Sequence, residues 1–415
     1  MEEVEQRITY APKEGDVKPA KNRISIRQSN IELLRIICMV MIIAHHFCVH
    51  TAMTFDPNVI SFNRIWYDFL YTGGKIGVNI FILITGYFSF RNVTLKLGKL
   101  FQFYLQIFFY SLVIFLVFAI AKLPVGDGGN YVFTWRGLID NLLPVTSSAW
   151  WFVSGYFVII LISPFLNYFI NAISRTGLKI ILIIVGVLFV VIPTIYIDTN
   201  FFTANWDRNP VIWFVFLYLL GSYYGKYGFR FNVKARTLFL IFFGICLLTY
   251  GTVIIFDYVG MNNSWFIFDN RNKYFFEMQT LPMLIASVCL FEAFLKIDIG
   301  SHKSINFISS LTFGIYLIHD NKLLRELLWK TFVRDTLFAK WLNAPNVEAS
   351  PYFVPVSIAC IASVFIAGAL IECARLYLIE PLYSKYIKKL GKKLDDKVNN
   401  YITKEGVPGN ITQIS

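Results

Sequence analysis

The chain has 415 residues, of which 56% are hydrophobic and 15% are charged. This composition excludes an ordinary soluble globular protein, in which about a quarter of the residues are charged. The formal net charge is +12, but the basic residues are spread over short loops and a lysine-rich C-terminal stretch, so we expect contact with anionic membrane lipids and no nucleic-acid partner.

Apolar runs long enough to cross a bilayer, which takes about 20 helical residues, recur along the whole chain. In chain order they predict ten spans, at residues 31–50, 73–90, 100–122, 150–172, 178–197, 211–226, 236–257, 278–297, 306–320 and 352–380. The predicted fold class is therefore all-α: a polytopic integral membrane protein with about ten transmembrane helices in one bundle.

We expect three parts: a disordered cytoplasmic N-terminal tail at 1–28, a transmembrane domain at 29–383 and a basic cytoplasmic C-terminal tail at 384–415. About two thirds of the 38 Lys and Arg residues lie on the side of the bundle where the N-terminus lies. Because basic residues favour the cytoplasmic side, both termini are predicted to be cytoplasmic, in a multi-pass protein of the cell (plasma) membrane. Residues 321–341 carry leucines at helical spacing and predict an interfacial helix.

Cysteines give no sign of a disulfide or a metal site. All six fall inside predicted spans without paired spacing, at Cys38, Cys48, Cys246, Cys289, Cys360 and Cys373. We expect them to be small buried apolar residues, and we predict no metal-binding site.

The first span, "NIELLRIICMVMIIAHHFCV", contains charged residues, which cost about 2.5 to 3.5 kcal/mol each at a helix centre. Arg35 and His46 return to nearly the same helix face, roughly 16 Å apart along the axis. Glu32 shares that face and can pair with Arg35 at the i,i+3 spacing, whereas His45 points about 100° away. One alternative stays open: Glu32 and Arg35 merely pair near the inner interface, and neighbouring helices satisfy the histidines.

The order of these residues resembles the first span of the acyltransferase-3 family, whose signature is an acidic residue, two positions, Arg, ten positions and His. Further segments resemble family motifs in the same order, namely "GVNIFILITGYFSF", "AWWFVSGYFVIILISPFLN", "SSLTFGIYLIHD" and "YLIEPLY". At Lys96 and Lys99, "KLGK" stands where the family has two arginines three positions apart. The matches extend over residues 30–383.

The resemblance implies an O-acetyltransferase of the stand-alone type that modifies bacterial polysaccharides. Such an enzyme takes the acyl group from cytoplasmic acyl-CoA, usually acetyl-CoA, and transfers it to a hydroxyl of a cell-surface or lipid-linked glycan. Its expected partners are acyl-CoA, the glycan acceptor and membrane lipids. We predict no permanently bound cofactor.

The predicted catalytic residues are His46, Arg35 and Glu32. Burial favours a neutral imidazole, so His46 can act as general base; whether it carries the acyl group transiently instead stays open. The guanidinium of Arg35 suits a phosphate or the thioester oxyanion, and Glu32 would hold its geometry.

Two further sets of residues are predicted to bind the substrates. The predicted CoA-binding cations are Arg91, Lys96 and Lys99. The predicted acceptor-binding residues are Trp150, Trp151, Tyr316 and His319. The alternatives are ordinary inner-loop positive charges for the first set, and an interfacial aromatic belt with a solvated histidine for the second.

Three other polar residues are expected to be structural. His50 and His302 are predicted to be loop residues, and Glu380, which precedes a proline, to end a helix or to pair with Arg375.

A second class of protein stays open, because a transporter or flippase of a glycan or lipid precursor also places charges inside its spans. The sequence shows no internal repeat that would favour it. A third class, a sensor or scaffold without catalysis, is disfavoured by the intact Arg35 and His46. Consumption of acetyl-CoA by the purified protein would separate the enzyme from the other two.

Overall fold

The computed structural model describes residues 29–56, 59–123, 134–196, 210–228, 233–262, 273–342 and 347–404. The predicted N-terminal tail and residues 405–415 of the C-terminal tail lie outside this part. The helices are α1 (Ser29–Thr51), α2 (Phe62–Ser89), α3 (Leu97–Ala121), α4 (Trp135–Leu142), α5 (Trp151–Ala172), α6 (Arg175–Gly186), η3 (Val187–Val191), α7 (Ile192–Ile195), α9 (Val211–Tyr227), α10 (Ala235–Asn262), η4 (Tyr274–Phe276), α12 (Leu281–Lys296), α13 (Lys303–His319), α14 (Lys322–Arg325), η5 (Glu326–Trp341), α15 (Phe353–Ala374), η6 (Arg375–Ile379) and α16 (Glu380–Lys404).

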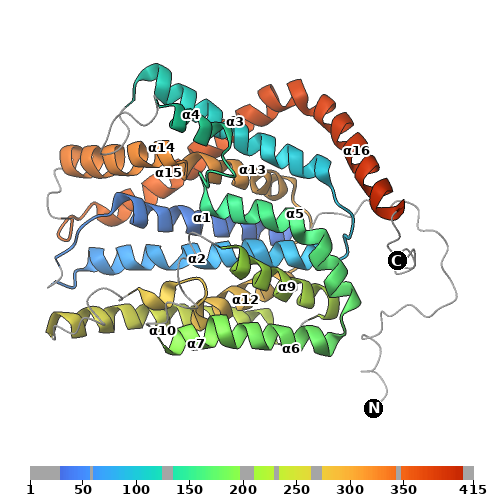
Figure 1. Cartoon of the computed structure of the whole chain (residues 1–415). Coiled ribbons are helices and arrows are strands. Elements are labelled where there is room, and N and C mark those ends of the chain that lie inside the picture. Colours follow the sequence, from blue (N-terminus) through green and yellow to red (C-terminus); the bar gives the residue numbers. More distant parts are fainter. Residues whose placement is uncertain are drawn as a thin grey trace, which may run out of the picture.

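The described residues form an all-α bundle without strands. Eight of its helices are long and apolar enough to cross a membrane. The helices α9 and α13, with 17 residues each, lie alongside them. Every one of the ten predicted spans overlaps a helix of this bundle (Figure 1), so the prediction of an all-α polytopic membrane protein is confirmed.

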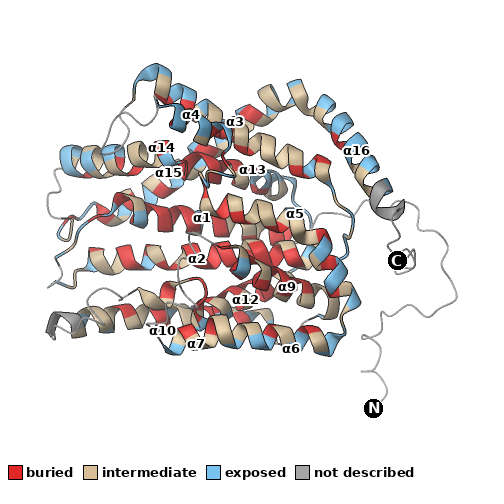
Figure 2. Cartoon of the chain, viewed as in Figure 1, coloured by how far each residue is buried: buried red, intermediate tan, exposed pale blue. Residues whose placement is uncertain are grey.

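The core of the bundle is built around α1 and α2. These two helices pack along each other, and α1 also contacts α12, α13 and α15. Figure 2 shows buried residues gathered on these inner helices, whereas α4 and α16 are largely exposed. The polar face of α1 is therefore enclosed by protein on several sides.

Glycines let α2 and α9 approach closely. A Cβ atom added to Gly86 would lie 2.2 Å from the carbonyl oxygen of Tyr218, and one added to Gly221 would lie 2.3 Å from that of Leu83. Small residues at a crossing allow this backbone contact between membrane helices. The glycine of the "TGY" motif thus has a packing role in the structure.

The helix α2 begins at Phe62, earlier than the predicted span at 73–90. The sequence before residue 73 contains Arg64 and Asp68. Because charged residues are costly inside a membrane span, the sequence alone favoured a loop over a helix there. In the structure Arg64 pairs with Asp257 at 2.8 Å and Asp68 with Lys273 at 2.7 Å. Because neighbouring segments supply opposite charges, the helix can include both residues.

The helix α13 ends at His319, and the next two residues, Asp320 and Asn321, are not helical. Helical structure resumes at α14, where Asn321 Oδ1 accepts hydrogen bonds from the backbone N–H groups of Leu323 and Leu324 at 3.0 and 3.3 Å. The helix α14 contacts α3, and η5 contacts α1. Residues 321–341, predicted to form an interfacial helix, therefore run alongside the bundle (Figure 1).

The last span continues directly into the C-terminal helix. The chain is helical from α15 through the π-helical turn η6 to α16, so Glu380 does not end a helix, and that prediction is wrong. The wide π turn precedes Pro381. Proline has no backbone N–H to donate and its ring clashes with the preceding turn, so a regular α-helical hydrogen bond cannot form there. The predicted pairing is confirmed, because Arg375 donates to Glu380 at 3.1 Å and to Glu372 at 2.8 and 2.9 Å.

Candidate active site

The site forms where one face of α1, with polar residues at its two ends, lies against a polar face of α13. Along α1 this stripe of residues follows the helical repeat through Glu32, Arg35, Met39, Ile42 and His46. Its counterpart consists of Ser309, Thr312 and Tyr316 on α13 and of Asp320, which directly follows the helix. Spacings of three and four residues keep each set on one helix face, and the two helices pack against each other.

Arg35 and Glu32 form the end of this stripe that the charge pattern predicts to be the inner one. Arg35 Nη1 lies 3.3 Å from Glu32 Oε1, which confirms the predicted i,i+3 pair. Ser309 Oγ donates to Glu32 Oε2 at 2.5 Å and ties the pair to α13. Glu32 is buried and Arg35 is 30% exposed along its side chain, so the carboxylate anchors a guanidinium that still reaches open space.

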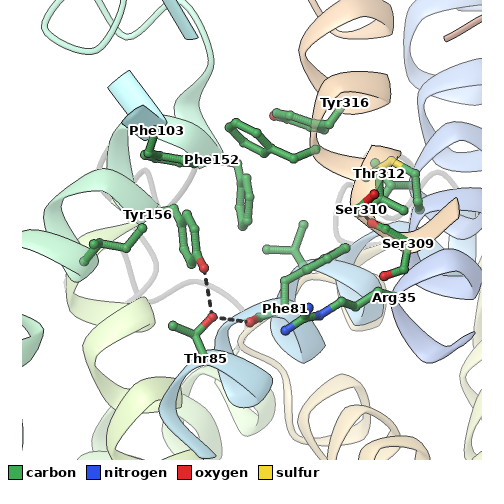
Figure 3. A pocket seen from close by; sticks show the side chains of 15 residues that line it. Arg35, Phe81, Thr85, Phe103, Phe152, Tyr156, Ser309, Ser310, Thr312 and Tyr316 are labelled. Carbon is green, nitrogen blue, oxygen red and sulfur yellow. Dashed lines mark hydrogen bonds between the residues drawn. The ribbon is translucent and has the colours of Figure 1, made fainter. Parts of the chain in front are cut away.

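That space is a cavity of about 320 Å³ that we name the central cavity. It is lined by Arg35, Met39, Ile42, Val78, Phe81, Thr85, Phe103, Phe152, Tyr156, Ile160, Ser309, Ser310, Thr312, Phe313 and Tyr316. Figure 3 shows Arg35 reaching into it, opposite the hydrogen-bonded Thr85 and Tyr156. Its walls are mostly apolar, with polar groups concentrated near Arg35.

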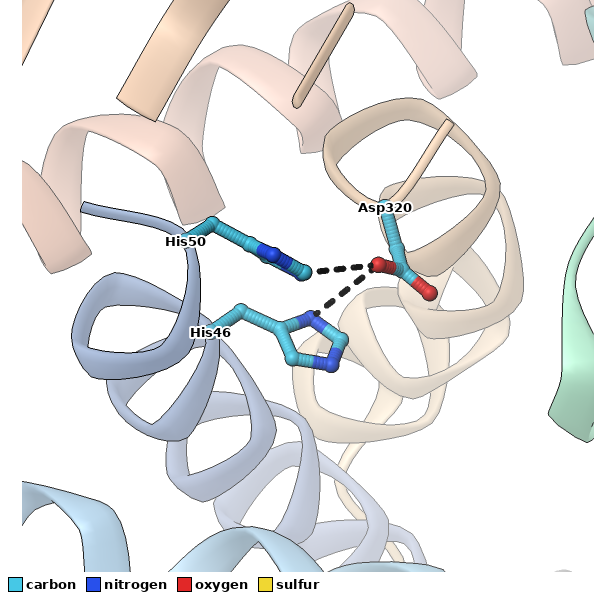
Figure 4. Close-up of side chains that lie close together, drawn as sticks. All are labelled: His46, His50 and Asp320. Carbon is cyan, nitrogen blue, oxygen red and sulfur yellow. Dashed lines mark hydrogen bonds and ion pairs between the residues drawn. The ribbon is translucent and has the colours of Figure 1, made fainter. Parts of the chain in front are cut away.

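His46 lies at the centre of a group of hydrogen-bonded side chains near the break after α13. Its Nδ1 is 2.9 Å from His319 Nε2, and His319 Nδ1 is 2.7 Å from the carbonyl oxygen of Ile315. Asp320 Oδ1 lies 3.8 Å from His46 Nδ1 and 3.2 Å from His50 Nε2 (Figure 4). The carboxylate thus faces two imidazoles of α1 at once.

A cavity of about 260 Å³ opens beside these histidines. We name it the outer cavity, after the side of the membrane that the charge pattern predicts for this end of the bundle. It is lined by Ile42, His45, His46, Val49, His50, Tyr71, Gly74, Lys75, Val78, Trp151, Glu277, Tyr316, Asp320 and Arg325. Three residues, Ile42, Val78 and Tyr316, line both this cavity and the central one. These three side chains therefore form a wall that the two cavities share, next to His46, and we name them the neck.

A third cavity, of about 190 Å³, lies at the inner start of α3 and is named the basic cavity. Lys96 and Lys99 line it, together with Ser89, Asn92 and Ser163. Ile160 lines both this cavity and the central one. Three cavities thus follow one another from the lysines, past Arg35, to His46.

The remaining predicted residues occupy different surroundings. Arg91 is exposed and lies over the ring of Phe90, with 5.2 Å between its guanidinium carbon and the ring centroid, and it lines none of the three cavities. Trp151 lines the outer cavity, with Lys75 Nζ 5.7 Å from its ring centroid. Trp150 is buried beside it and lines no cavity of the three.

The two adjacent histidines of α1 differ in their contacts. His45 Nδ1 lies 2.8 Å from the carbonyl oxygen of Tyr71, and the His45 ring lies where a Cβ on Gly74 would be. His46 instead contacts His319, which lies behind it and lines none of the three cavities. His45 is thus packed against α2, whereas His46 is hydrogen-bonded to α13.

His50 and Asp320 were not identified as site residues from the sequence. The prediction of a loop at His50 is wrong, because α1 extends to Thr51. The spacing His46-x-x-x-His50 was the available signal, since residues four apart share a helix face. The ligand atoms of His46, His50 and Asp320 lie within 4.8 Å of one another, close enough for a metal ion, but Arg325 Nη1, 3.7 Å from Asp320, already supplies a positive charge there.

The fold and the site together define a polytopic membrane protein with a buried histidine between two cavities. Residues 28–372 match a family model described as an acyltransferase domain. Since the match covers most of the chain, the protein belongs to the acyltransferase-3 family and is a membrane acyltransferase. Comparison with curated proteins and with solved structures gives no match.

Proposed function

We propose that the protein is an O-acetyltransferase that moves the acetyl group of cytoplasmic acetyl-CoA to a hydroxyl of a cell-surface or lipid-linked glycan. The observation that carries the proposal is that the central and outer cavities share the neck as a wall beside His46. A donor that enters from one side and an acceptor from the other would place the thioester and the hydroxyl at the same imidazole.

The chemistry of the cavities supports a CoA donor on the inner side. Lys96 and Lys99 in the basic cavity offer positive charge for phosphates. The mostly apolar central cavity suits the slender pantetheine arm, and Arg35 can donate to its carbonyl groups. Because Ile160 lines both cavities, they are neighbours, and we expect one extended ligand to occupy both.

The outer cavity supports a sugar acceptor. Trp151 and Tyr71 offer aromatic faces, while Asp320, Arg325 and Lys75 offer hydrogen-bonding groups to hydroxyls. Binding sites generally combine apolar faces with a few placed polar groups in this way.

The proposed reaction proceeds by direct attack. The Nε2 atom of His46 takes the proton of the acceptor hydroxyl, whose oxygen forms a bond to the thioester carbonyl carbon. The tetrahedral intermediate then breaks its C–S bond, and the leaving thiolate takes the proton back from His46. The products are the acetyl ester and free CoA.

The test uses the purified protein in lipid vesicles with radiolabelled acetyl-CoA inside and glycan acceptor outside. We expect label to appear in the glycan, and a deletion strain to lose acetyl mass from its surface glycan. Export of unmodified glycan without any acetylation would instead identify a transporter and contradict the proposal.

Sidedness can be tested by single-cysteine labelling in a cysteine-free background. The proposal places Asn92 on the cytoplasmic side and Val59 on the outer side; both side chains are exposed. An impermeant thiol reagent added to intact cells should label a cysteine at 59 and not one at 92. Labelling at 92 alone would reverse the orientation and exclude a cytoplasmic donor.

Replacing Arg35 with lysine should lower acyl transfer by on the order of 10- to 100-fold. An ammonium cannot keep the planar contact with Glu32 and at the same time donate to the donor in the central cavity. The measurement is the initial rate against acetyl-CoA concentration at equal amounts of folded protein. Lys179→Arg, at an exposed position of α6, is the matched control; a wild-type rate for Arg35→Lys would leave Arg35 with a purely structural role.

A further inference from the structure

We infer that His319 is a positioning residue that fixes the tautomer of His46, so that the Nε2 atom of His46 carries a free lone pair toward the outer cavity. The catalytic meaning of this inference rests on the proposed function. The hydrogen-bond chemistry itself rests only on the contacts among Ile315, His319 and His46.

The first step fixes the proton on His319. A backbone carbonyl oxygen only accepts hydrogen bonds, and the Ile315 carbonyl lies 2.7 Å from His319 Nδ1. His319 Nδ1 therefore carries a proton and donates it. Because His319 is 1% exposed, burial favours the neutral ring, in which the other nitrogen, Nε2, is an acceptor.

The second step transfers this constraint to His46. The acceptor Nε2 of His319 lies 2.9 Å from His46 Nδ1, so His46 Nδ1 must be the donor of that hydrogen bond. A neutral His46 then has an unprotonated Nε2. No described residue hydrogen-bonds that atom, and His46 lines the outer cavity, where an acceptor hydroxyl would arrive.

Asp320 reinforces the same tautomer. Its Oδ1 lies 3.8 Å from the proton-bearing Nδ1 of His46 and so favours positive charge on that side of the ring. The other charged or titratable groups facing Asp320 are His50 at 3.2 Å, Arg325 at 3.7 Å, Tyr316 and His319. When His46 takes a proton at Nε2, the carboxylate stabilises the resulting imidazolium, as a third group does for catalytic histidines in other folds.

The direct test is the ¹⁵N NMR spectrum of protein with ring-labelled histidine, since a protonated and an unprotonated ring nitrogen have distinct shifts. The chain has only five histidines, so single substitutions assign each ring. We expect an unprotonated Nε2 and a protonated Nδ1 for His46 in the wild type. A protonated Nε2 on His46 in the wild type would overturn the inference.

Three variants separate positioning from simple structural support. His319→Leu removes the acceptor, and the His46 signals should shift toward a mixture of tautomers. His319→Gln can place a carbonyl oxygen near the position of Nε2 and should restore the wild-type pattern. His302→Leu, at an exposed histidine outside the site, should leave the His46 signals unchanged. Unchanged His46 signals in His319→Leu would also overturn the inference.

Activity gives a second readout. His319→Leu should lower acyl transfer by on the order of 10² to 10⁴-fold, the range seen when a catalytic histidine adopts the wrong tautomer, and His319→Gln should recover most of it. If acetyl-CoA is not consumed even by the wild type, the proposed function fails. The tautomer measurement still decides the inference, because it needs neither donor nor acceptor.

Discussion

Replacing His46 with alanine should abolish acyl transfer, with a loss on the order of 10³-fold or more. The substitution removes the imidazole that lines the outer cavity beside the neck and bonds to His319 of α13. General base catalysis alone contributes about 10² to 10⁴-fold. The measurement is the initial rate of acetyl transfer from labelled acetyl-CoA, at matched amounts of folded protein in detergent or vesicles.

The neighbouring histidine supplies the matched control. His45→Gln keeps a polar side chain that can reach the Tyr71 carbonyl, and we expect at least a third of the wild-type rate. His45→Ala would also leave an empty space against Gly74, so it is the poorer control. Loss of transfer in His45→Gln together with retention in His46→Ala would exchange the roles of the two residues.

Replacing Tyr316 with phenylalanine should lower the rate by on the order of 10 to 10³-fold without unfolding the protein. Its hydroxyl is buried next to Asp320 and makes no hydrogen bond of standard geometry with the described residues. The ring lies 6.3 Å from that of His46 and forms part of the neck. A free hydroxyl at this position can donate to the oxyanion of the tetrahedral intermediate.

The effect should appear in the maximal rate more than in the apparent affinity for acetyl-CoA, because the donated hydrogen bond strengthens as negative charge develops. Tyr250→Phe is the control, since its hydroxyl donates to the Ile65 carbonyl at 2.6 Å on the periphery of the bundle. Equal rates for wild type and Tyr316→Phe would exclude the oxyanion role and leave the ring as a wall of the neck.

The sequence predicted the inner end of the site because that part is local. Glu32 and Arg35 lie one turn apart on a single helix, so helix geometry alone places them in contact, and the structure confirms it. The same geometry set His46 apart from His45. No knowledge of neighbouring helices was needed for either conclusion.

The outer end of the site could not be predicted, because its contacts join residues about 270 positions apart, such as His50 and Asp320. Helical periodicity does not say which spans become neighbours. The predicted end of the span at residue 320 agrees with the break after His319, but the contact of η5 with α1 did not follow from the sequence. The role of Asn321 as a helix cap shows only in the structure.

Charged residues at span ends caused the error in α2. Hydropathy counts Arg64 and Asp68 as costs, and their partners Asp257 and Lys273 lie far along the chain. A short sequence window used for hydropathy does not contain both partners of such an ion pair, so it counts only the cost of the charge. Long-range ion pairs therefore shift the true start of a helix away from the point where hydropathy rises.

The neck formed by Ile42, Val78 and Tyr316 has a consequence for the proton gradient across the membrane. An enzyme open to both faces of a membrane would dissipate the proton gradient if water filled it from end to end. Two aliphatic side chains and an aromatic ring line both the central and the outer cavity, and apolar groups at this shared wall would interrupt a continuous water wire. Under the proposed function, an acyl group would be transferred at that point while protons and ions stay on their own sides.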